Sequence, residues 1–311
     1  MPISLISISP MPISPMTLTR RQFLSPFTTL AALGVGSTAY GLGIEPAYRL
    51  HVQHYTLKPA NWSAGLKLRI AALSDIHASE PYMSAARLRE IVTLANAQNA
   101  DMIVLLGDYV VGSGAHYRKL PHAEWAAELA NLKAPLGVFG ILGNHDWWQY
   151  WDDRQKSADE VMMALRSAGI TVLHNNLLKL QKSGAPFWLA GLGDQLAFMN
   201  PATHQGKGSD DLPATLAQIN DDAPVILLAH EPDIFVKVPA RVSLTMSGHT
   251  HGGQIRILGW SPVIPSRYGN RFAYGHIQEN GRDLLVTGGL GVSRIPVRIG
   301  VPPEIMLVDL G

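Results

Sequence analysis

The chain has 311 residues, of which 47% are hydrophobic and 16% are charged. This length allows one large domain or two small ones, with enough apolar residues for a sizeable core. The net charge of +1 argues against a general nucleic-acid binder, and the absence of cysteine excludes disulfides and thiolate metal sites.

The first predicted element, residues 1–43, is a targeting segment. Residues 19–24 read Thr-Arg-Arg-Gln-Phe-Leu and precede an apolar stretch rich in small residues. This order resembles a twin-arginine export signal. A buried N-terminal helix is the alternative, and the lack of an amphipathic pattern favours the signal. No clean cleavage site is visible, so a retained membrane anchor is also open, and we expect a periplasmic protein or one on the outer face of the inner membrane.

The remaining residues, 44–311, are predicted to form one α/β domain. Strands and helices alternate in the first half, and strands dominate the second. We expect two mixed sheets packed face to face, with helices outside them. The expected helices are 84–97, 123–132, 157–168 and 212–219, and the expected strands are 50–57, 66–73, 101–106, 137–142, 171–173, 177–181, 187–192, 225–229, 242–246, 284–287 and 305–310.

Polar residues gather directly after five of the predicted strands. Ligands bind at the carboxyl ends of strands in open α/β sheets. Each cluster alone has an ordinary explanation, since a Gly-Asp pair is common and Asn-His-Asp is often a turn. A His-x-His pair on a strand is more specific, because it puts both imidazoles on one face. The clusters are Asp75 and His77; Asp108; Asn144, His145 and Asp146; His230; and His249 and His251.

Taken together, these clusters predict a metal centre. Burying so many ionisable groups near one another costs several kcal/mol each unless something compensates them, as divalent cations do. Two aspartates, one asparagine and four histidines suit a pair of metals that share one carboxylate. Oxygen and nitrogen ligands without thiolates favour Mn, Fe, Zn or Ni.

In this order, the five clusters resemble the pattern of the calcineurin-like metallophosphoesterase superfamily. The resemblance covers residues 66–310, nearly the whole mature chain. The motifs Gly-His-Thr-His-Gly-Gly-Gln, Gly-Gly-Leu-Gly, Pro-Val-Arg and Pro-Pro-Glu-Ile further resemble a bacterial branch of exported or membrane-associated enzymes. The family fold is a two-sheet αββα sandwich, which agrees with the predicted strands.

The resemblance implies a ligand set for two divalent metals. Asp108 is the shared ligand, because a carboxylate can span ions about 3.5–4 Å apart. Asn144 is neutral, which keeps the site from becoming too anionic for a phosphate. One metal would take Asp75, His77, Asp108 and His251, and the other Asp108, Asn144, His230 and His249.

The resemblance also implies hydrolysis of a phosphate ester. A hydroxide that bridges the metals would attack phosphorus. His145 would then protonate the leaving oxygen as general acid, with Asp146 accepting a hydrogen bond that fixes the tautomer of His145. A third metal ligand is the alternative role for His145. Arg294 and Arg298 could bind a second phosphate or a head group, or could form solvent-facing salt bridges.

An aromatic group follows the predicted acid motif. It is predicted to form an apolar lip for a lipid or a nucleoside, with burial in the core as the alternative. Its near-continuous order, interrupted only by Gln149, fits no single buried face and favours the lip. The group consists of Trp147, Trp148, Tyr150 and Trp151.

We therefore expect a phosphodiesterase or phosphatase that acts on an envelope or lipid-linked substrate. The alternatives are a pyrophosphatase for a nucleotide-activated lipid sugar, a nuclease, and a non-catalytic metal-binding scaffold on the same fold. Every family position that can be identified is filled, which argues against the scaffold. The expected partners are the phosphate ester, the twin-arginine export machinery and, for a retained segment, a membrane surface. We expect a monomer and no nucleic-acid partner.

Overall fold

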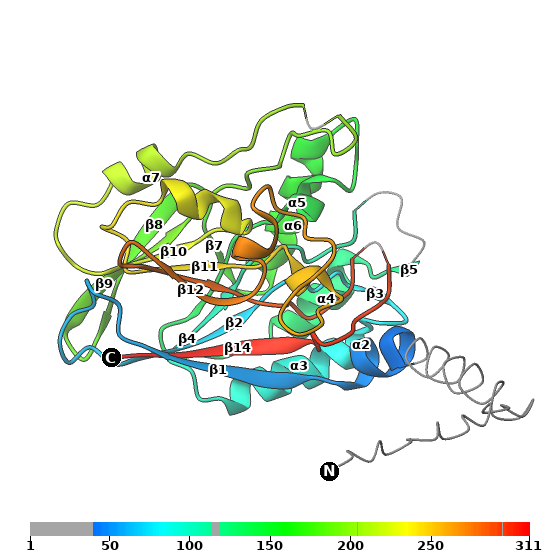
Figure 1. The fold of residues 1–311 in the computed structure, drawn as a ribbon, viewed down its shortest axis with the longest axis horizontal. Helices are drawn as coiled ribbons and strands as arrows, with labels where there is room; N and C mark the ends of the chain where they lie inside the picture. The colour runs from blue at the N-terminus through cyan, green and yellow to red at the C-terminus, as the bar shows by residue number, and fades with distance from the viewer. Residues whose placement is uncertain (1–39, 113–117, 204, 294) are drawn as a thin grey trace, which may run out of the picture. The chain divides into compact units, whose positions relative to one another are not determined.

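The computed structural model describes residues 40–112, 118–203, 205–293 and 295–311. Residues 41–311 form one compact unit (Figure 1). The twin-arginine motif and the apolar stretch up to residue 39 lie outside the described residues. Within the described part of the chain, no helix is long and apolar enough to cross a membrane.

The first of two six-stranded sheets has the order β1-β14-β2-β4-β6-β7. Strands β2, β4, β6 and β7 run parallel, whereas β14 is antiparallel to β2 and parallel to the edge strand β1. In sheet order the strands are β1 (His51–Leu57), β14 (Glu304–Leu310), β2 (Leu68–Leu73), β4 (Met102–Leu105), β6 (Val138–Gly140) and β7 (Thr171–Val172).

The second sheet has the order β12-β13-β11-β10-β9-β8. Its four central strands run parallel, and both edge strands are antiparallel to their neighbours. In sheet order the strands are β12 (Gly275–Glu279), β13 (Arg282–Val286), β11 (Leu244–Ser247), β10 (Val225–Leu228), β9 (Ala185–Gly191) and β8 (Asn176–Lys182). Short strands β3 (Ser79–Glu80) and β5 (Arg118–Lys119) form a separate pair.

Three apolar clusters show that the two sheets lie face to face between helical layers. The middle cluster holds inward side chains of both sheets, including Ile70 and Val104 from the first and Leu228 and Met246 from the second. A second cluster packs α3 (Ala85–Ala97), α4 (His122–Leu129) and α6 (Arg154–Ser167) on the first sheet. The third covers the second sheet with α7 (Leu212–Ala217), η2 (Pro232–Lys237) and η4 (Gly269–Phe272). The expected αββα sandwich is confirmed.

Helix α3 shows why local sequence specifies these elements. Ser84 is its N-cap, and its side chain accepts a hydrogen bond from the Arg87 N–H at 3.2 Å. The apolar residues of the helix recur at helical spacing, so one face is buried against the first sheet. That face carries Leu88, Ile91, Val92 and Ala95.

Every predicted strand and helix is present, and their ends differ by a few residues. Strand β12 was not predicted, because its sequence Gly-His-Ile-Gln-Glu contains a single strongly apolar residue and none of its five residues is buried. The Asn-His-Asp motif begins the short helix α5 (Asn144–Trp147). The chain before β1 also forms η1 (Tyr40–Ile44) and α2 (Glu45–Tyr48), while η3 (His251–Gly253) follows β11.

Trp125 of α4 provides a test of the helical layer. Its ring is completely buried and stacks on Tyr109 with centroids 5.7 Å apart. Replacing Trp125 by Ala should lower the free energy of unfolding by about 3–5 kcal/mol, because a large cavity would remain. Met163→Ala on the exposed face of α6 is the control and should change stability by less than about 0.5 kcal/mol. Urea denaturation measures both, and equal effects would contradict the packing described.

Candidate metal centre

The seven predicted metal ligands follow five strands and lie at one edge of the sandwich. Strands β2, β4 and β6 belong to the first sheet, and β10 and β11 belong to the second. The carboxyl ends of these strands meet, as is typical of ligand sites in α/β folds. The side chains that follow the strands are, in chain order, Asp75, His77, Asp108, Asn144, His230, His249 and His251.

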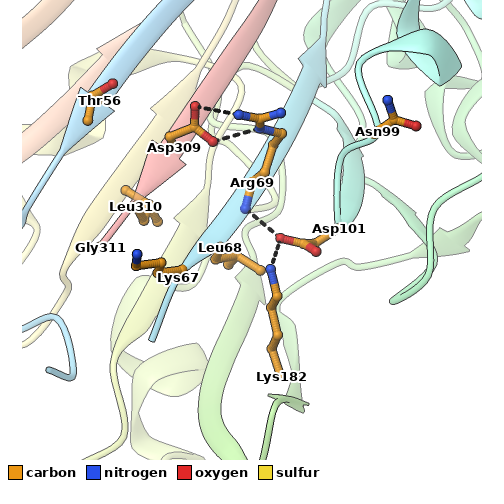
Figure 2. Close-up of a pocket in the computed structure, with 10 residues that line it drawn as sticks. All are labelled: Thr56, Lys67, Leu68, Arg69, Asn99, Asp101, Lys182, Asp309, Leu310 and Gly311. Atoms are coloured by element: carbon orange, nitrogen blue, oxygen red, sulfur yellow. Dashed lines mark hydrogen bonds and ion pairs between the residues drawn. The ribbon is translucent and has the colours of Figure 1, made fainter. Parts of the chain in front are cut away.

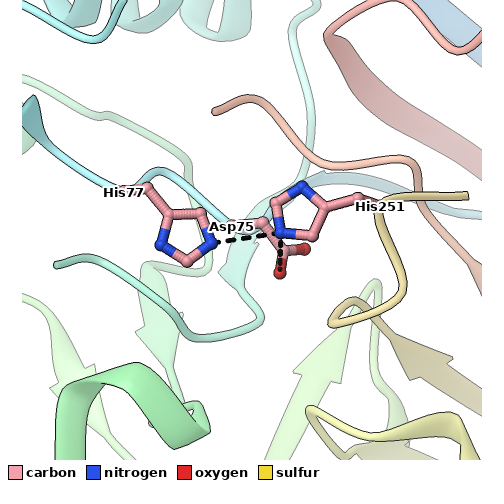
Figure 3. A group of neighbouring side chains, drawn as sticks. All are labelled: Asp75, His77 and His251. Atoms are coloured by element: carbon pink, nitrogen blue, oxygen red, sulfur yellow. Dashed lines mark hydrogen bonds and ion pairs between the residues drawn. The ribbon is translucent and has the colours of Figure 1, made fainter. Parts of the chain in front are cut away.

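The first group of ligands contains Asp75, His77 and His251, and all three are buried. Figure 3 shows these side chains pointing toward one another. The Nε2 atoms of His77 and His251 are 3.1 Å apart, and His251 Nε2 is 3.4 Å from Asp75 Oδ1. One atom of each residue therefore faces a common point, which is how a metal is held.

The second group contains Asp108, His230 and His249. His230 Nε2 lies 3.3 Å from Asp108 Oδ2, and the rings of His230 and His249 are 5.1 Å apart. Asn144 joins this group through its Oδ1 atom, which is 2.9 Å from His249 Nδ1. The structure thus brings together the side chains of the two expected ligand sets, and their role as ligands stays a prediction.

Asp108 lies between the two groups. Its Oδ2 atom is 3.6 Å from His77 Nε2 in the first group and 3.3 Å from His230 Nε2 in the second. Its other oxygen, Oδ1, accepts the backbone N–H of His145 at 2.8 Å. A single carboxylate oxygen thus faces both groups, while hydrogen bonding fixes the rest of the side chain.

The tautomers of the buried histidines fit divalent metals. His77 Nδ1 donates to the carbonyl of Val110 at 3.1 Å, and His230 Nδ1 donates to the carbonyl of Leu106 at 2.6 Å. In the neutral form of each ring, Nε2 then carries the lone pair that binds a metal. His230 Nε2 is buried and has no hydrogen-bond partner among the described residues. A cation would satisfy it.

The buried carboxylates and imidazoles of the site also favour binding of a cation. Burial raises the pKa of Asp75, and the neighbouring Asp108 raises it further. Burial, followed by His77 and Arg298, holds the pKa of His251 well below its usual value, so this ring is neutral. Buried carboxylates beside neutral imidazoles suit Mn, Fe, Zn or Ni.

Most of the ligands sit on strained backbone. A positive φ is uncommon outside glycine, and each case costs of order 1–3 kcal/mol unless the surroundings enforce it. Sharp turns after the strands aim these side chains back into the space between the sheets. Five of the seven ligands have this conformation: Asp75, His77, Asp108, His249 and His251.

Two glycines of the motifs let the ligand loops approach closely. A Cβ atom on Gly248 would lie 2.6 Å from Asp75 Oδ2, and one on Gly143 would lie 2.7 Å from the backbone nitrogen of Asp108. Neither position has room for a side chain. The Gly-His-Thr-His and Gly-Asn-His-Asp motifs therefore begin with glycine because another loop packs against them.

The partner of His145 differs from the one expected. His145 Nδ1 accepts the backbone N–H of Gly112 at 2.9 Å, so the proton of the neutral ring is on Nε2. Burial lowers the pKa of His145 to about 3, which keeps the ring neutral. Asp146 forms no hydrogen bond with this ring; it accepts the N–H groups of Asp108 and Gly143, both at 2.9 Å. Asp146 therefore ties together two ligand loops.

Arg298 lies behind the metal centre and does not face the cavity. Its side chain is fully buried and donates to the carbonyls of Gly291 and Val301. Its Nη2 atom is 3.3 Å from His251 Nδ1. The expected contact with substrate does not fit this burial, and the residue instead positions the loop beside His251. Arg294 lies outside the described residues.

The aromatic group is divided between the core and the cavity wall. Trp147 is only 2% exposed and packs in the core, so the predicted lip does not include it. Trp148 lines the cavity while its Nε1 atom donates to the carbonyl of Ala197 at 3.2 Å. Trp151 is half exposed and stacks on Trp148. Helix α5 causes this division, because it turns successive side chains to different sides.

A cavity of about 1130 Å³ opens over the metal ligands. Most of its wall comes from loops without sequence motifs, which is why it was not predicted. Two acidic residues near the cavity also follow predicted strands at this edge, so the same sequence signal that identified the ligands applies to them. Asp194 comes after β9, and Glu231, which accepts the Gln195 N–H at 3.1 Å, comes after β10.

A smaller cavity of about 440 Å³ lies at the opposite end of β2, away from the ligands (Figure 2). Four of its charged side chains are paired with one another, and Lys67 has no ion pair among the described residues. Arg69 binds both carboxylate oxygens of Asp309, at 2.7 and 3.1 Å, and Lys182 pairs with Asp101. These pairs leave little free charge for a ligand.

Comparison with known proteins agrees with this geometry. The calcineurin-like phosphoesterase family matches residues 68–253, a range that includes all seven predicted ligands. The Bacillus subtilis protein named uncharacterized metallophosphoesterase YkuE is 30% identical over 300 residues, covering 94% of this chain and 98% of its own length. The Escherichia coli protein named phosphodiesterase YaeI is 28% identical over 302 residues, covering 94% and 99% respectively.

Among solved structures, a dimetal phosphatase from Danio rerio matches with a TM-score of 0.41 and 14% identity, covering 72% of this chain and 88% of that chain. Members of the family use two divalent metal ions, and the two groups around Asp108 supply a place for each. The chain therefore belongs to the calcineurin-like phosphoesterase family and is a metal-dependent phosphoesterase.

Proposed function

We propose that the enzyme hydrolyses phosphodiesters that carry a large apolar group, such as lipid-linked molecules of the cell envelope. The observation that carries this proposal is the cavity of about 1130 Å³ that opens directly over the ligands. It exceeds what a phosphate with a small alcohol needs, since drug-sized ligands fill roughly 300–1,000 Å³. Its apolar wall includes Trp148, Leu196, Met199, Val236, Ile264 and Ile295.

The buried ligands would hold two divalent ions, which supply charge stabilisation for the phosphate and a nucleophilic water. Asp108 would help to hold both ions, because its Oδ2 atom faces His77 of one group and His230 of the other, and Asp146 keeps Asp108 in place by binding N–H groups of its loop. Arg298 holds the loop behind His251. The chain thus fixes the ligands before substrate arrives, which lowers the cost of reorganisation during the reaction.

We further propose that His145 acts from its neutral form. The N–H of Gly112 occupies Nδ1, which leaves Nε2–H as the donor. His145 also lines the cavity, beside Asn144 and Trp148. From this position Nε2–H can donate to the leaving oxygen as the ester bond breaks, which stabilises the charge that develops there.

The substrate proposal is tested with the purified, metal-loaded chain on four compounds: a monoester, a diester, a phospholipid and a nucleotide-linked lipid sugar. We expect the phospholipid diester to have the highest kcat/KM, because the apolar wall contributes binding. Preference for a short soluble ester would contradict the proposal. Preference for the nucleotide-linked compound would instead support the pyrophosphatase alternative.

Two substitutions should separate metal binding from hydrogen-bond donation to the leaving oxygen. Asp108→Ala should reduce bound metal and abolish turnover, because both ligand groups lose their shared oxygen. His145→Ala should keep both metals and slow turnover by about 10²–10⁴-fold, with the smallest loss for good leaving groups. Metal analysis and steady-state kinetics measure these effects.

Asp309→Ala is the control for Asp108, since Asp309 is a carboxylate far from the ligands in the opposite cavity. It should keep wild-type metal content and turnover. Loss of metal from His145→Ala would make this residue a ligand and would rule out the proposed role.

We propose that residues 1–43 direct export by the twin-arginine route, so that the enzyme works on the outer side of the inner membrane. The arginine pair at residues 20–21 and the apolar stretch after it support this proposal. Export of a folded, metal-loaded enzyme suits a site built from ligands of both sheets.

Replacing Arg20 and Arg21 by lysine should keep the protein in the cytoplasm, because the pair would no longer be recognised. Fractionation of bacterial cells with immunoblotting measures this. Arg118→Lys, an exposed arginine of the folded domain, is the control and should leave the distribution unchanged. An unchanged location of the double variant would contradict twin-arginine export.

A further inference from the structure

A strongly apolar loop projects from the enzyme between η3 and η4. We define the apolar loop as residues 257–263, Ile-Leu-Gly-Trp-Ser-Pro-Val. Ile257 and Trp260 are each 60% exposed, Val263 is 73% exposed, and Leu258 is fully exposed. Scattered apolar side chains are normal on a protein surface, whereas a contiguous set marks an interaction site.

The apolar loop is an ordered turn. Ile257 and Trp260 exchange backbone hydrogen bonds of 2.9 and 3.0 Å. Leu258 and Gly259 between them both have positive φ, as in a type I′ turn. Asparagine or aspartate is the usual first central residue of such a turn, because both tolerate a positive φ that strains leucine. A strained and fully exposed leucine therefore indicates that this position has a function other than packing within the protein.

The apolar loop continues into the mouth of the cavity over the metal ligands. Pro262 and Val263 line that cavity together with Ile264 and Pro265. Ile295, which is also exposed, lines the cavity from a neighbouring segment. A surface that covered the loop would therefore also face the opening to the metal centre.

The charge around the apolar loop favours an anionic partner. Residues 254–278 contain three arginines and no acidic residue. Arg271 pairs with Glu279, whereas the side chains of Arg256 and Arg267 form no ion pair among the described residues. The Arg256 guanidinium donates to Ser261 Oγ at 3.4 Å, and the backbone N–H of Arg267 donates to Asp233 Oδ2 at 2.9 Å. Apolar and aromatic side chains flanked by cations are typical of surfaces that bind anionic lipids.

The beginning of the compact unit lies beside the base of the apolar loop. The Arg298 N–H donates to the Gly41 carbonyl at 2.9 Å, and Arg256, at the base of the loop, donates its N–H to Ile299 at 2.8 Å. Leu42 and Ile44 next to this point are exposed. The compact unit therefore begins on the same side as the base of the loop.

We propose that the apolar loop inserts into the surface of an anionic lipid bilayer and brings the cavity mouth against it. Leu258 enters deepest, Trp260 lies at the level of the head groups, and Arg256 and Arg267 contact lipid phosphates. Membrane contact by the loop does not depend on the proposed function. Transfer of a lipid ester from the bilayer into the cavity does rest on the proposed function.

The chain has no cysteine, so a single fluorescent label can report insertion. Full-length Leu258→Cys carrying an environment-sensitive fluorophore is mixed with vesicles of phosphatidylethanolamine and phosphatidylglycerol. We expect a several-fold rise in emission with a blue shift, and quenching by brominated lipid tails. The control label is at Ser183→Cys, an exposed residue of the β8–β9 hairpin at the opposite end of the sheets. It should not respond.

An equal response at both labels, or none at Leu258→Cys, would overturn the proposal. A response that grows with protein concentration without vesicles would also overturn it, since a second copy of the chain would then cover the loop. Equal insertion into vesicles of phosphatidylcholine alone would exclude the roles given to the two arginines.

A second measurement separates membrane contact from catalysis. A variant with Ile257→Ser, Leu258→Ser and Trp260→Ser should keep wild-type turnover of a soluble diester, because these residues do not line the cavity. Its turnover of a phospholipid in vesicles should fall at least tenfold. Label insertion without any hydrolysis of phospholipid by the parent enzyme would leave membrane contact standing and refute the lipid substrate. Unchanged vesicle turnover in the variant would refute the role of the loop.

Discussion

The structure depends on how Asp108 is placed between two groups of buried imidazoles. One of its oxygens faces His77 and His230, and hydrogen bonding to the backbone holds the other. Such a concentration of buried polar groups is unfavourable without a cation. The αββα sandwich makes it possible, because parallel strands from both sheets end at one edge and sharp turns redirect their last side chains inward.

Residues around the ligands stabilise the strained turns that carry them. Asp146 joins the loops after β4 and β6 through N–H groups of both, and Arg298 binds two carbonyls of the segment behind His251. These bonds hold the ligand loops in backbone conformations that would otherwise be unfavourable. The site is therefore rigid where metals bind and open where the cavity begins, so the substrate side is free to take large groups.

The cavity and the apolar loop extend the same surface. Val263 belongs to both, and Trp148 lines the same cavity beside His145. The proposed apolar substrate would reach this cavity from a lipid phase. The arginines near the loop and the position of Gly41 beside its base support an anionic membrane as that phase.

The sequence by itself determined the longer helices, most strands and the polar side chains that gather at one edge of the sheets, because these follow from local apolar patterns and from polar residues at strand ends. It did not determine the roles of residues whose partners are distant in the chain. Asp146 binds a loop that lies far earlier in the sequence, Arg298 is buried by segments that meet only in the fold, and Trp147 turns into the core because α5 forms. Tertiary packing decides such contacts, since no local pattern records which loops will lie together.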